Sequence, residues 1–218
     1  MNPILDDFFE YLGIVLLFIN ACLYIWSYRT IRGSVALKYF STYLATIFIV
    51  LLSSLLIVKV FKVRNNLYLS HLYFLSQFVL LSLFYKSQFK KNQKKWVNIT
   101  LSLVLLIVTI QYINKPQLLK KFNLFEIFIS SFPLVVYSIV HLYNALNNKG
   151  KYMLINAGVL MYIATSTLIF ILGDYITSNT KNHLIAKIWF INKVLYVGYL
   201  LLILVEWKKN ISPLSSKS

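Results

Sequence analysis

Hydrophobic residues recur in seven long runs along the chain, and short polar segments separate these runs. The runs cover residues 11–28, 38–61, 67–85, 96–113, 123–146, 152–174 and 184–207. Each run is roughly 18 to 24 residues long, the length that an α-helix needs to cross a hydrocarbon core of about 30 Å. Tyr and Trp residues stand near the ends of the runs, among them Trp26, Trp96 and Trp207. The pattern predicts an all-α, polytopic membrane protein, with residues 1–218 forming one seven-transmembrane-helix bundle.

The fifth run carries polar or helix-perturbing residues along one side of the expected helix. At about 100° per residue, these positions fall within an arc of roughly 80°. They are Glu126, Ser130, Pro133, Tyr137, His141 and Asn144. We expect a buried polar stripe with a kink at Pro133. Two interpretations stay open at this point: the stripe lines a cavity or pathway, or its side chains form hydrogen bonds between packed helices.

The seventh run contains a lysine deep within its apolar sequence. A charged side chain inside a bilayer is costly and usually faces the bundle interior, where it finds a partner. Lys193 shares one side of its helix with Trp189, Asn192 and Tyr196. We hypothesise that Lys193 pairs with Glu126 of the fifth run.

Other runs add polar residues to the predicted interior. In the third run, Ser70, Tyr73 and Gln77 share one face, and His71 is displaced from Ser70 by about 100°. Asn20 and Asn156 are predicted to form hydrogen bonds between helices, and Gly158 is predicted to be a helix-packing residue. The residues that we predict to bind a ligand or line a cavity are His71, Gln77, Glu126, Tyr137, Asn192 and Lys193.

Composition agrees with a protein whose solvent is lipid. Hydrophobic residues make up 59% of the 218 residues, charged residues only 13%, and the mean hydropathy is +0.69. The net charge of +16 comes from Lys and Arg residues in the short gaps between runs, so nucleic-acid binding is not expected. More basic residues fall in the gaps on the side of the carboxyl terminus. This predicts the amino terminus outside and the carboxyl terminus inside, with residues 210–218 as a short disordered tail.

Residues suited to catalysis or metal binding are few. Cys22 is the only cysteine, and His71, His141 and His183 lie on different elements without a metal-binding spacing. Beyond the amino terminus, the acidic residues are Glu126, Asp174 and Glu206, which form no paired-carboxylate motif. A retinal protein would have a lysine in the last helix, but the third run has no carboxylate that could be its counterion. We expect no enzymatic activity, no catalytic residues, no metal and no cofactor.

A diffuse set of residues carries a resemblance that covers nearly the whole chain. The set comprises Asn65, Asn66, His71, Tyr73, Gln77, Tyr85, Trp96, Asn192 and Tyr196. On these positions the chain resembles a group of uncharacterised seven-helix inner-membrane proteins of Bacteroidota, whose members often have a glutamate at the position of Gln77. The group looks like the seven-helix sensory modules of some histidine kinases. The resemblance implies a multi-pass protein of the bacterial inner membrane and implies no chemistry.

These observations favour a receptor-like or accessory membrane sensor. Such a protein would pass a conformational change to a separate membrane or cytoplasmic protein, because the gaps between runs are too short for a soluble output domain. Membrane lipids would be its other partners. The alternatives are a small-solute or ion transporter that uses the same polar residues as a pathway, and a structural subunit of a membrane complex.

Overall fold

The computed structural model describes residues 3–30, 34–62, 66–146, 150–179 and 183–212, with only the backbone described for residues 3, 174–179 and 183–186. Seven α-helices make up nearly all of this part of the chain. They are α1 (Pro3–Thr30), α2 (Val35–Lys59), α3 (Tyr68–Gln88), α4 (Lys91–Asn114), α5 (Leu124–Leu146), α6 (Met153–Asn179) and α7 (His183–Glu206). A short 3-10 helix, η1 (Pro116–Lys120), follows α4, and a π-helical turn, η2 (Trp207–Ile211), continues α7.

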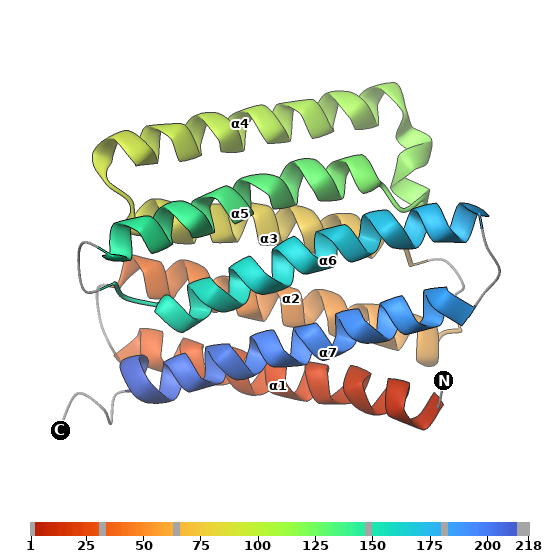
Figure 1. Ribbon diagram of the computed structural model, residues 1–218, viewed down its shortest axis with the longest axis horizontal. Coiled ribbons are helices and arrows are strands. Elements are labelled where there is room, and N and C mark those ends of the chain that lie inside the picture. Colours follow the sequence, from red (N-terminus) through yellow and green to blue (C-terminus); the bar gives the residue numbers. More distant parts are fainter. Residues whose placement is uncertain (1–2, 31–33, 63–65, 147–149, 180–182, 213–218) are drawn as a thin grey trace.

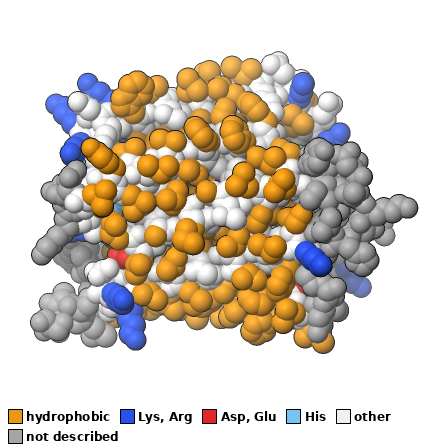
Figure 2. Space-filling view, viewed as in Figure 1, with side chains coloured by type: hydrophobic (Ala, Val, Ile, Leu, Met, Phe, Trp, Pro, Cys, Tyr) orange, Lys and Arg blue, Asp and Glu red, His pale blue; other side chains and the backbone are white. Residues whose placement is uncertain are grey.

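Each of the seven α-helices is long and apolar enough to cross a membrane. In the visible face of the space-filling view, hydrophobic side chains cover the middle of the molecule, and Lys and Arg side chains lie toward its two ends (Figure 2). An apolar belt between two charged ends matches the hydrocarbon layer and the two headgroup layers of a bilayer. The described part of the chain is therefore that of an all-α, multi-pass membrane protein, as the hydrophobic runs predicted.

Six helices close a ring, and one lies outside it. Along the ring, α1 packs on α2, α2 on α3, α3 on α5, α5 on α6, α6 on α7, and α7 returns to α1. Helix α4 lies at the edge of the bundle against α3 and α5 (Figure 1). Below, the amino-terminal end of the bundle is the end at which α1 begins, and the carboxyl-terminal end is the one at which α7 ends.

Aromatic side chains fill the centre of the ring. Phe40, Tyr43, Phe84 and Tyr85 are all at most 1% exposed. Their large rings pack against one another, for example Phe40 against Phe84 with ring centroids 5.1 Å apart. This packing leaves the centre of the bundle densely filled.

Buried polar side chains join neighbouring helices of the ring. Asn20 of α1 donates to the carbonyl oxygen of Leu200 of α7 at 3.1 Å. The Tyr85 hydroxyl of α3 donates to Asn156 Oδ1 of α6 at 2.8 Å and lies 2.6 Å from the Ser138 hydroxyl of α5. The prediction that Asn20 and Asn156 form hydrogen bonds between helices is confirmed. Such bonds satisfy polar groups that would otherwise be unpaired in an apolar interior.

Gly158 allows α6 and α7 to approach closely, as its spacing predicted. A Cβ atom at this position would lie 2.9 Å from Tyr199 Cδ2 of α7. The Tyr162 ring, one turn further along α6, stacks on the Tyr199 ring at a centroid distance of 5.2 Å and an interplanar angle of 6°. The missing side chain and the stacked rings together fix the contact between these two helices.

Both ends of the chain are more helical than the hydrophobic runs indicated. Helix α1 begins at Pro3, well before residue 11, and so includes the acidic residues near the amino terminus. At the other end, Asn210 and Ile211 belong to η2, and Ile211 is buried, so the disordered tail predicted from residue 210 is wrong for these two residues. Residues 213–218 of that tail lie outside the described residues.

Candidate ligand-binding site

The polar stripe of α5 faces the interior of the bundle. Glu126, Ser130, Pro133, Tyr137 and His141 are buried, which confirms the face that the periodicity predicted. Near the carboxyl-terminal end of the stripe, His141 Nε2 donates to Gln88 Oε1 of α3 at 2.9 Å. Asn144 and Gln93 of α4 form two reciprocal amide hydrogen bonds, of 3.0 and 3.2 Å. This half of the stripe is a contact between helices.

The middle of the stripe is packed rather than open. Helix α5 continues through Pro133, which has no amide hydrogen and therefore leaves the carbonyl of Ile129 without its usual helical donor. The Tyr137 ring lies against the rings of Tyr85 and Phe89, and its buried hydroxyl has no hydrogen-bond partner.

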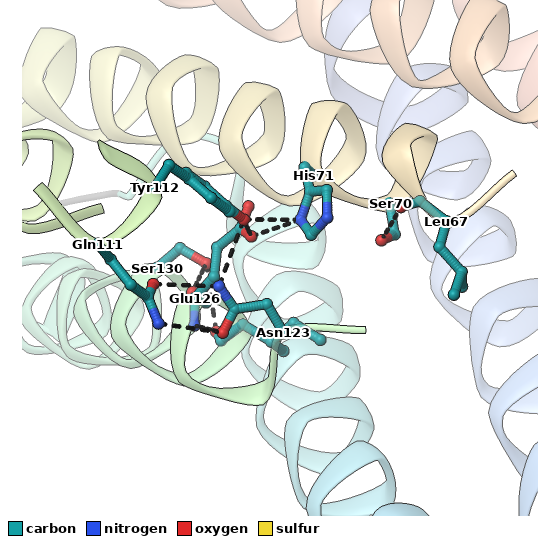
Figure 3. Close-up of polar contacts among 9 residues, drawn as sticks. Leu67, Ser70, His71, Gln111, Tyr112, Asn123, Glu126 and Ser130 are labelled. Carbon is teal, nitrogen blue, oxygen red and sulfur yellow. Dashed lines mark hydrogen bonds and ion pairs between the residues drawn. The ribbon is translucent and has the colours of Figure 1, made fainter. Parts of the chain in front are cut away.

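Glu126 binds a histidine and a tyrosine at the amino-terminal end of the bundle (Figure 3). His71 Nδ1 of α3 lies 2.6 Å from Glu126 Oε2. The hydroxyl of Tyr112, from α4, donates to the same carboxylate oxygen and lies 2.8 Å from His71 Nδ1. The Glu126 side chain is fully buried, and His71 is 5% exposed. We call this group, with Gln111 and Asn123, the His71–Glu126 cluster.

The local sequence explains why Glu126 points inward. Asn123 precedes α5, and its side-chain oxygen accepts a hydrogen bond from the Glu126 amide at 3.3 Å, the bond of a helix N-cap. Asn123 is held by Gln111 of α4, whose Oε1 accepts from Asn123 Nδ2 at 3.0 Å. With the cap supplied by Asn123, the Glu126 carboxylate stays in the first turn, where the helix dipole favours negative charge, and reaches across to α3 and α4.

Lys193 binds two carboxylates of α1 instead of Glu126. Its Nζ atom lies 2.8 Å from Asp6 Oδ2 and 2.9 Å from Glu10 Oε2. The hypothesised pair of Lys193 with Glu126 is therefore wrong. Helix α7 packs on α1 and α6, whereas Glu126 of α5 meets α3 in the ring and α4 outside it.

The first hydrophobic run begins at residue 11, so the sequence pattern did not place Asp6 and Glu10 in the helix bundle. In the structure they continue α1 by two turns. Asp6 and Glu10 are four residues apart, so their carboxylates lie on one face of the helix and can share one ammonium group. That spacing, joined to a helix start at Pro3, was the signal available in the sequence. We call Asp6, Glu10 and Lys193 the lysine triad.

A cavity of about 290 Å³ opens among α2, α3, α6 and α7 at the amino-terminal end. Its walls are mostly apolar and include six aromatic residues: Tyr73, Phe74, Phe122, Tyr162, Phe170 and Tyr196. Its polar lining comes from Ser54, Asn66, Ser70, Asn192 and Lys193. We call this space the amino-end cavity. An apolar cavity of this size with a few polar groups is typical of a small-molecule site.

Two buried polar atoms in the cavity wall have no hydrogen-bond partner within the protein. They are Asn192 Oδ1 and the Tyr196 hydroxyl oxygen. A buried polar group without a partner costs about 1–3 kcal/mol, so a ligand that bonds to these atoms offsets a cost that the protein's own groups leave in place.

A second cavity, of about 350 Å³, adjoins the first. Both are lined by Ser54, Asn66, Lys193 and Tyr196. The second cavity is also lined by Glu10 and Lys59, so it reaches the charged groups of α1 and α2. Lys193 thus stands in a wall common to both spaces.

The structure brings together only part of the predicted site. Asn192 and Lys193 line the amino-end cavity. His71 follows the lining residue Ser70 on α3 but pairs with Glu126 in a separate cluster. Gln77 and Tyr137 are buried but are not among the residues that line this cavity. Sequence reasoning placed Tyr73 and Tyr196 on polar faces but missed Phe74, Phe122 and Phe170, because phenylalanines recur along the hydrophobic runs and carry no distinguishing period.

Within the described part of the chain, no three His, Cys, Asp or Glu side chains gather in a way that could hold a metal ion. Comparisons with protein-family models, with curated proteins and with solved structures found no match for this chain.

Proposed function

We propose that the protein is a receptor-like membrane sensor that binds a small molecule in the amino-end cavity. The observation that carries this proposal is the pair of unpartnered polar atoms, Asn192 Oδ1 and the Tyr196 hydroxyl, in an aromatic cavity between helices. The ligand class that fits is a small, mostly apolar molecule with one hydrogen-bond donor. Asn192 Oδ1 can only accept, so the donor must come from the ligand.

The cavity is placed where a ligand could change helix packing. Its walls come from four of the six ring helices. Tyr162 of α6 and Tyr196 of α7 both line it and pack against each other, and Tyr162 also stacks on Tyr199 of α7. A ligand that prefers one packing of these helices shifts the population toward it. A separate protein would read that shift at the basic carboxyl-terminal end, which we propose faces the cytoplasm across a bacterial inner membrane.

The packed centre of the bundle supports a sensor over a transporter. Beyond the amino-end cavity, Phe40, Tyr43, Phe84 and Tyr85 occupy the centre of the ring with almost no exposure. A transporter would have to open a path through these rings in order to expose its site to the other side.

Cysteine accessibility separates the candidate functions without knowledge of the ligand. In a Cys22→Ala background, Ser54→Cys places one thiol in the wall shared by the two cavities. A sensor predicts that a membrane-impermeant maleimide modifies this thiol from one face of the membrane only. Modification from both faces would indicate a transporter, and protection from both faces would indicate a cavity closed by another subunit. Ser82→Cys, at a fully buried position, is the control that should stay unmodified.

A further inference from the structure

A larger cavity lies at the opposite end of the bundle. It has a volume of about 530 Å³ and lies where α3 and α5 end and where α2 begins. Its lining includes Ser34, Gln88, Lys90, His141, Lys151 and Tyr152. We call it the carboxyl-end cavity. Unlike the aromatic cavity at the other end, its walls carry many polar groups.

Positive charge dominates this cavity. Lys90 and Lys151 line it, and no acidic side chain is among its described lining residues. The nearest acidic residue along the carboxyl-terminal end is Glu206, which lines a neighbouring cavity. Its two carboxylate oxygens accept hydrogen bonds of 2.9 Å from the Leu154 amide and from Asn210, so they are occupied by α6 and η2.

The amino-terminal end of α2 adds a further positive element. Val35 and Ala36, the first residues of this 25-residue helix, line the cavity beside Ser34. The Ser34 side chain accepts from the Leu37 amide at 3.3 Å and so satisfies one of the amides of the first turn. The remaining first-turn amides lack helical acceptors and, with the helix dipole, favour an anion.

His141 provides the observation that points to a ligand. It is 6% exposed and lines the cavity, and its Nδ1 atom is buried without a hydrogen-bond partner. The other ring nitrogen, Nε2, is held by Gln88 Oε1 at 2.9 Å. The Gln88 amide nitrogen faces the Phe84 carbonyl at 3.4 Å, so its oxygen faces His141, and Nε2 is the donor. Nδ1 is therefore available to a ligand, as an acceptor in the neutral ring or a donor in the protonated ring.

We propose that the carboxyl-end cavity binds a phosphate group. Lys90 and Lys151 supply the opposing charge, the first turn of α2 supplies amide donors, and His141 Nδ1 completes the site. A phosphate oxygen accepts from the protonated ring. Inorganic phosphate or a phosphate monoester that retains a hydroxyl can also donate to the neutral ring, whereas a phosphodiester headgroup requires the protonated ring. The phosphate can belong to a lipid headgroup or to a soluble molecule, since basic sites between helix ends suit both. This site is independent of the ligand proposed for the amino-end cavity.

The test measures binding by purified full-length protein to three phosphate probes. Inorganic phosphate and glycerol 3-phosphate are titrated calorimetrically into protein in a neutral detergent. Phosphatidylglycerol is tested by native mass spectrometry of protein from nanodiscs, with phosphatidylcholine as the zwitterionic comparison. We expect one phosphate-bearing ligand per protein. Retention of phosphatidylglycerol alone identifies a lipid site, and saturable binding of a soluble probe identifies a soluble ligand.

Two variants and a charge-matched control locate the binding. Lys90→Gln with Lys151→Gln, and separately His141→Phe, should each weaken binding about tenfold, the effect expected for the loss of charge-assisted hydrogen bonds. Lys91→Gln with Lys95→Gln removes the same charge from exposed positions at the same end and should change binding less than about twofold. Absence of stoichiometric binding by every probe, or an equal loss in the control pair, would overturn the proposal.

Discussion

Lys193 and Asp6 lie 187 residues apart in the sequence, yet Lys193 Nζ is 2.8 Å from Asp6 Oδ2. This ion pair, extended by Glu10, ties the first helix of the ring to the last and stands beside the amino-end cavity. It closes the ring of helices at the end where we place ligand binding.

Removal of the lysine should destabilise the protein because two carboxylates lose their common partner. The three side chains are between 26% and 34% exposed, so solvent screens part of the effect. We expect Lys193→Met to lower the free energy of unfolding by about 1–3 kcal/mol. Thermal unfolding in detergent measures the loss.

Neutralising the carboxylates provides the control for this prediction. Adding Asp6→Asn and Glu10→Gln to Lys193→Met should recover most of the lost stability, because no uncompensated charge remains. If the triple variant is no more stable than Lys193→Met, then apolar contacts of the lysine stem matter more than its charge.

The His71–Glu126 cluster should show strong coupling between its members. Glu126→Leu leaves His71 Nδ1 and the Tyr112 hydroxyl without their acceptor in a buried site, at a cost of about 1–3 kcal/mol. The double variant Glu126→Leu with His71→Phe removes both partners. It should be less destabilised than the sum of the two single variants, as a double-mutant cycle from thermal unfolding would show. Additive effects would contradict a direct contact.

Two glycines of the sixth and seventh helices make a matched pair. Gly158→Ala places a methyl group 2.9 Å from Tyr199 Cδ2, so we expect a loss of about 1–3 kcal/mol from overpacking. Gly198→Ala places a methyl group where no heavy atom lies within 4 Å, so it should be neutral or slightly stabilising through its better helix propensity. The unfolding temperatures of the two variants, each compared with that of the unmodified protein, measure these effects. Equal effects would contradict the close packing of α6 on α7.

The orientation predicted from the basic residues can be tested with two exposed lysines at opposite ends. Lys209→Cys lies at the carboxyl-terminal end and Lys115→Cys at the amino-terminal end. In a Cys22→Ala background, an impermeant maleimide added to intact cells should modify Lys115→Cys and leave Lys209→Cys unmodified. The reverse result would place the amino terminus inside.

The sequence predicted the helices and their buried faces more completely than it predicted which helices pack against one another. Periodicity identified the inward face of α5 and the bonding roles of Asn20 and Asn156, because helix geometry alone decides which positions share a side. It could not decide which helix faces another. The predicted partner of Glu126 therefore lay on α7, whereas in the structure Glu126 contacts His71 of α3 and Tyr112 of α4.

The lysine triad shows what hydropathy alone does not predict. Hydropathy marks the part of a helix that contacts lipid, and the first two turns of α1 carry charges that hydropathy assigns to water. Those turns nonetheless pack on α7, because the charges are paired with Lys193. For the amino-end cavity, the sequence predicted Asn192 and Lys193 as lining residues but not most of the other walls, because a cavity depends on which helices pack together.

We propose above all that the amino-end cavity binds a small, mostly apolar molecule with a hydrogen-bond donor. Its most direct test is photolabelling of the purified protein with a phenyl diazirine that carries a primary amide, followed by mass spectrometric mapping of the adducts. We predict adducts on Phe74, Phe122 and Phe170, and we predict that Val50→Phe, which narrows the cavity, and Asn192→Leu, which removes the acceptor, both reduce them. Adducts confined to outward-facing residues such as Phe128 and Phe132, and unchanged in both variants, would contradict the account.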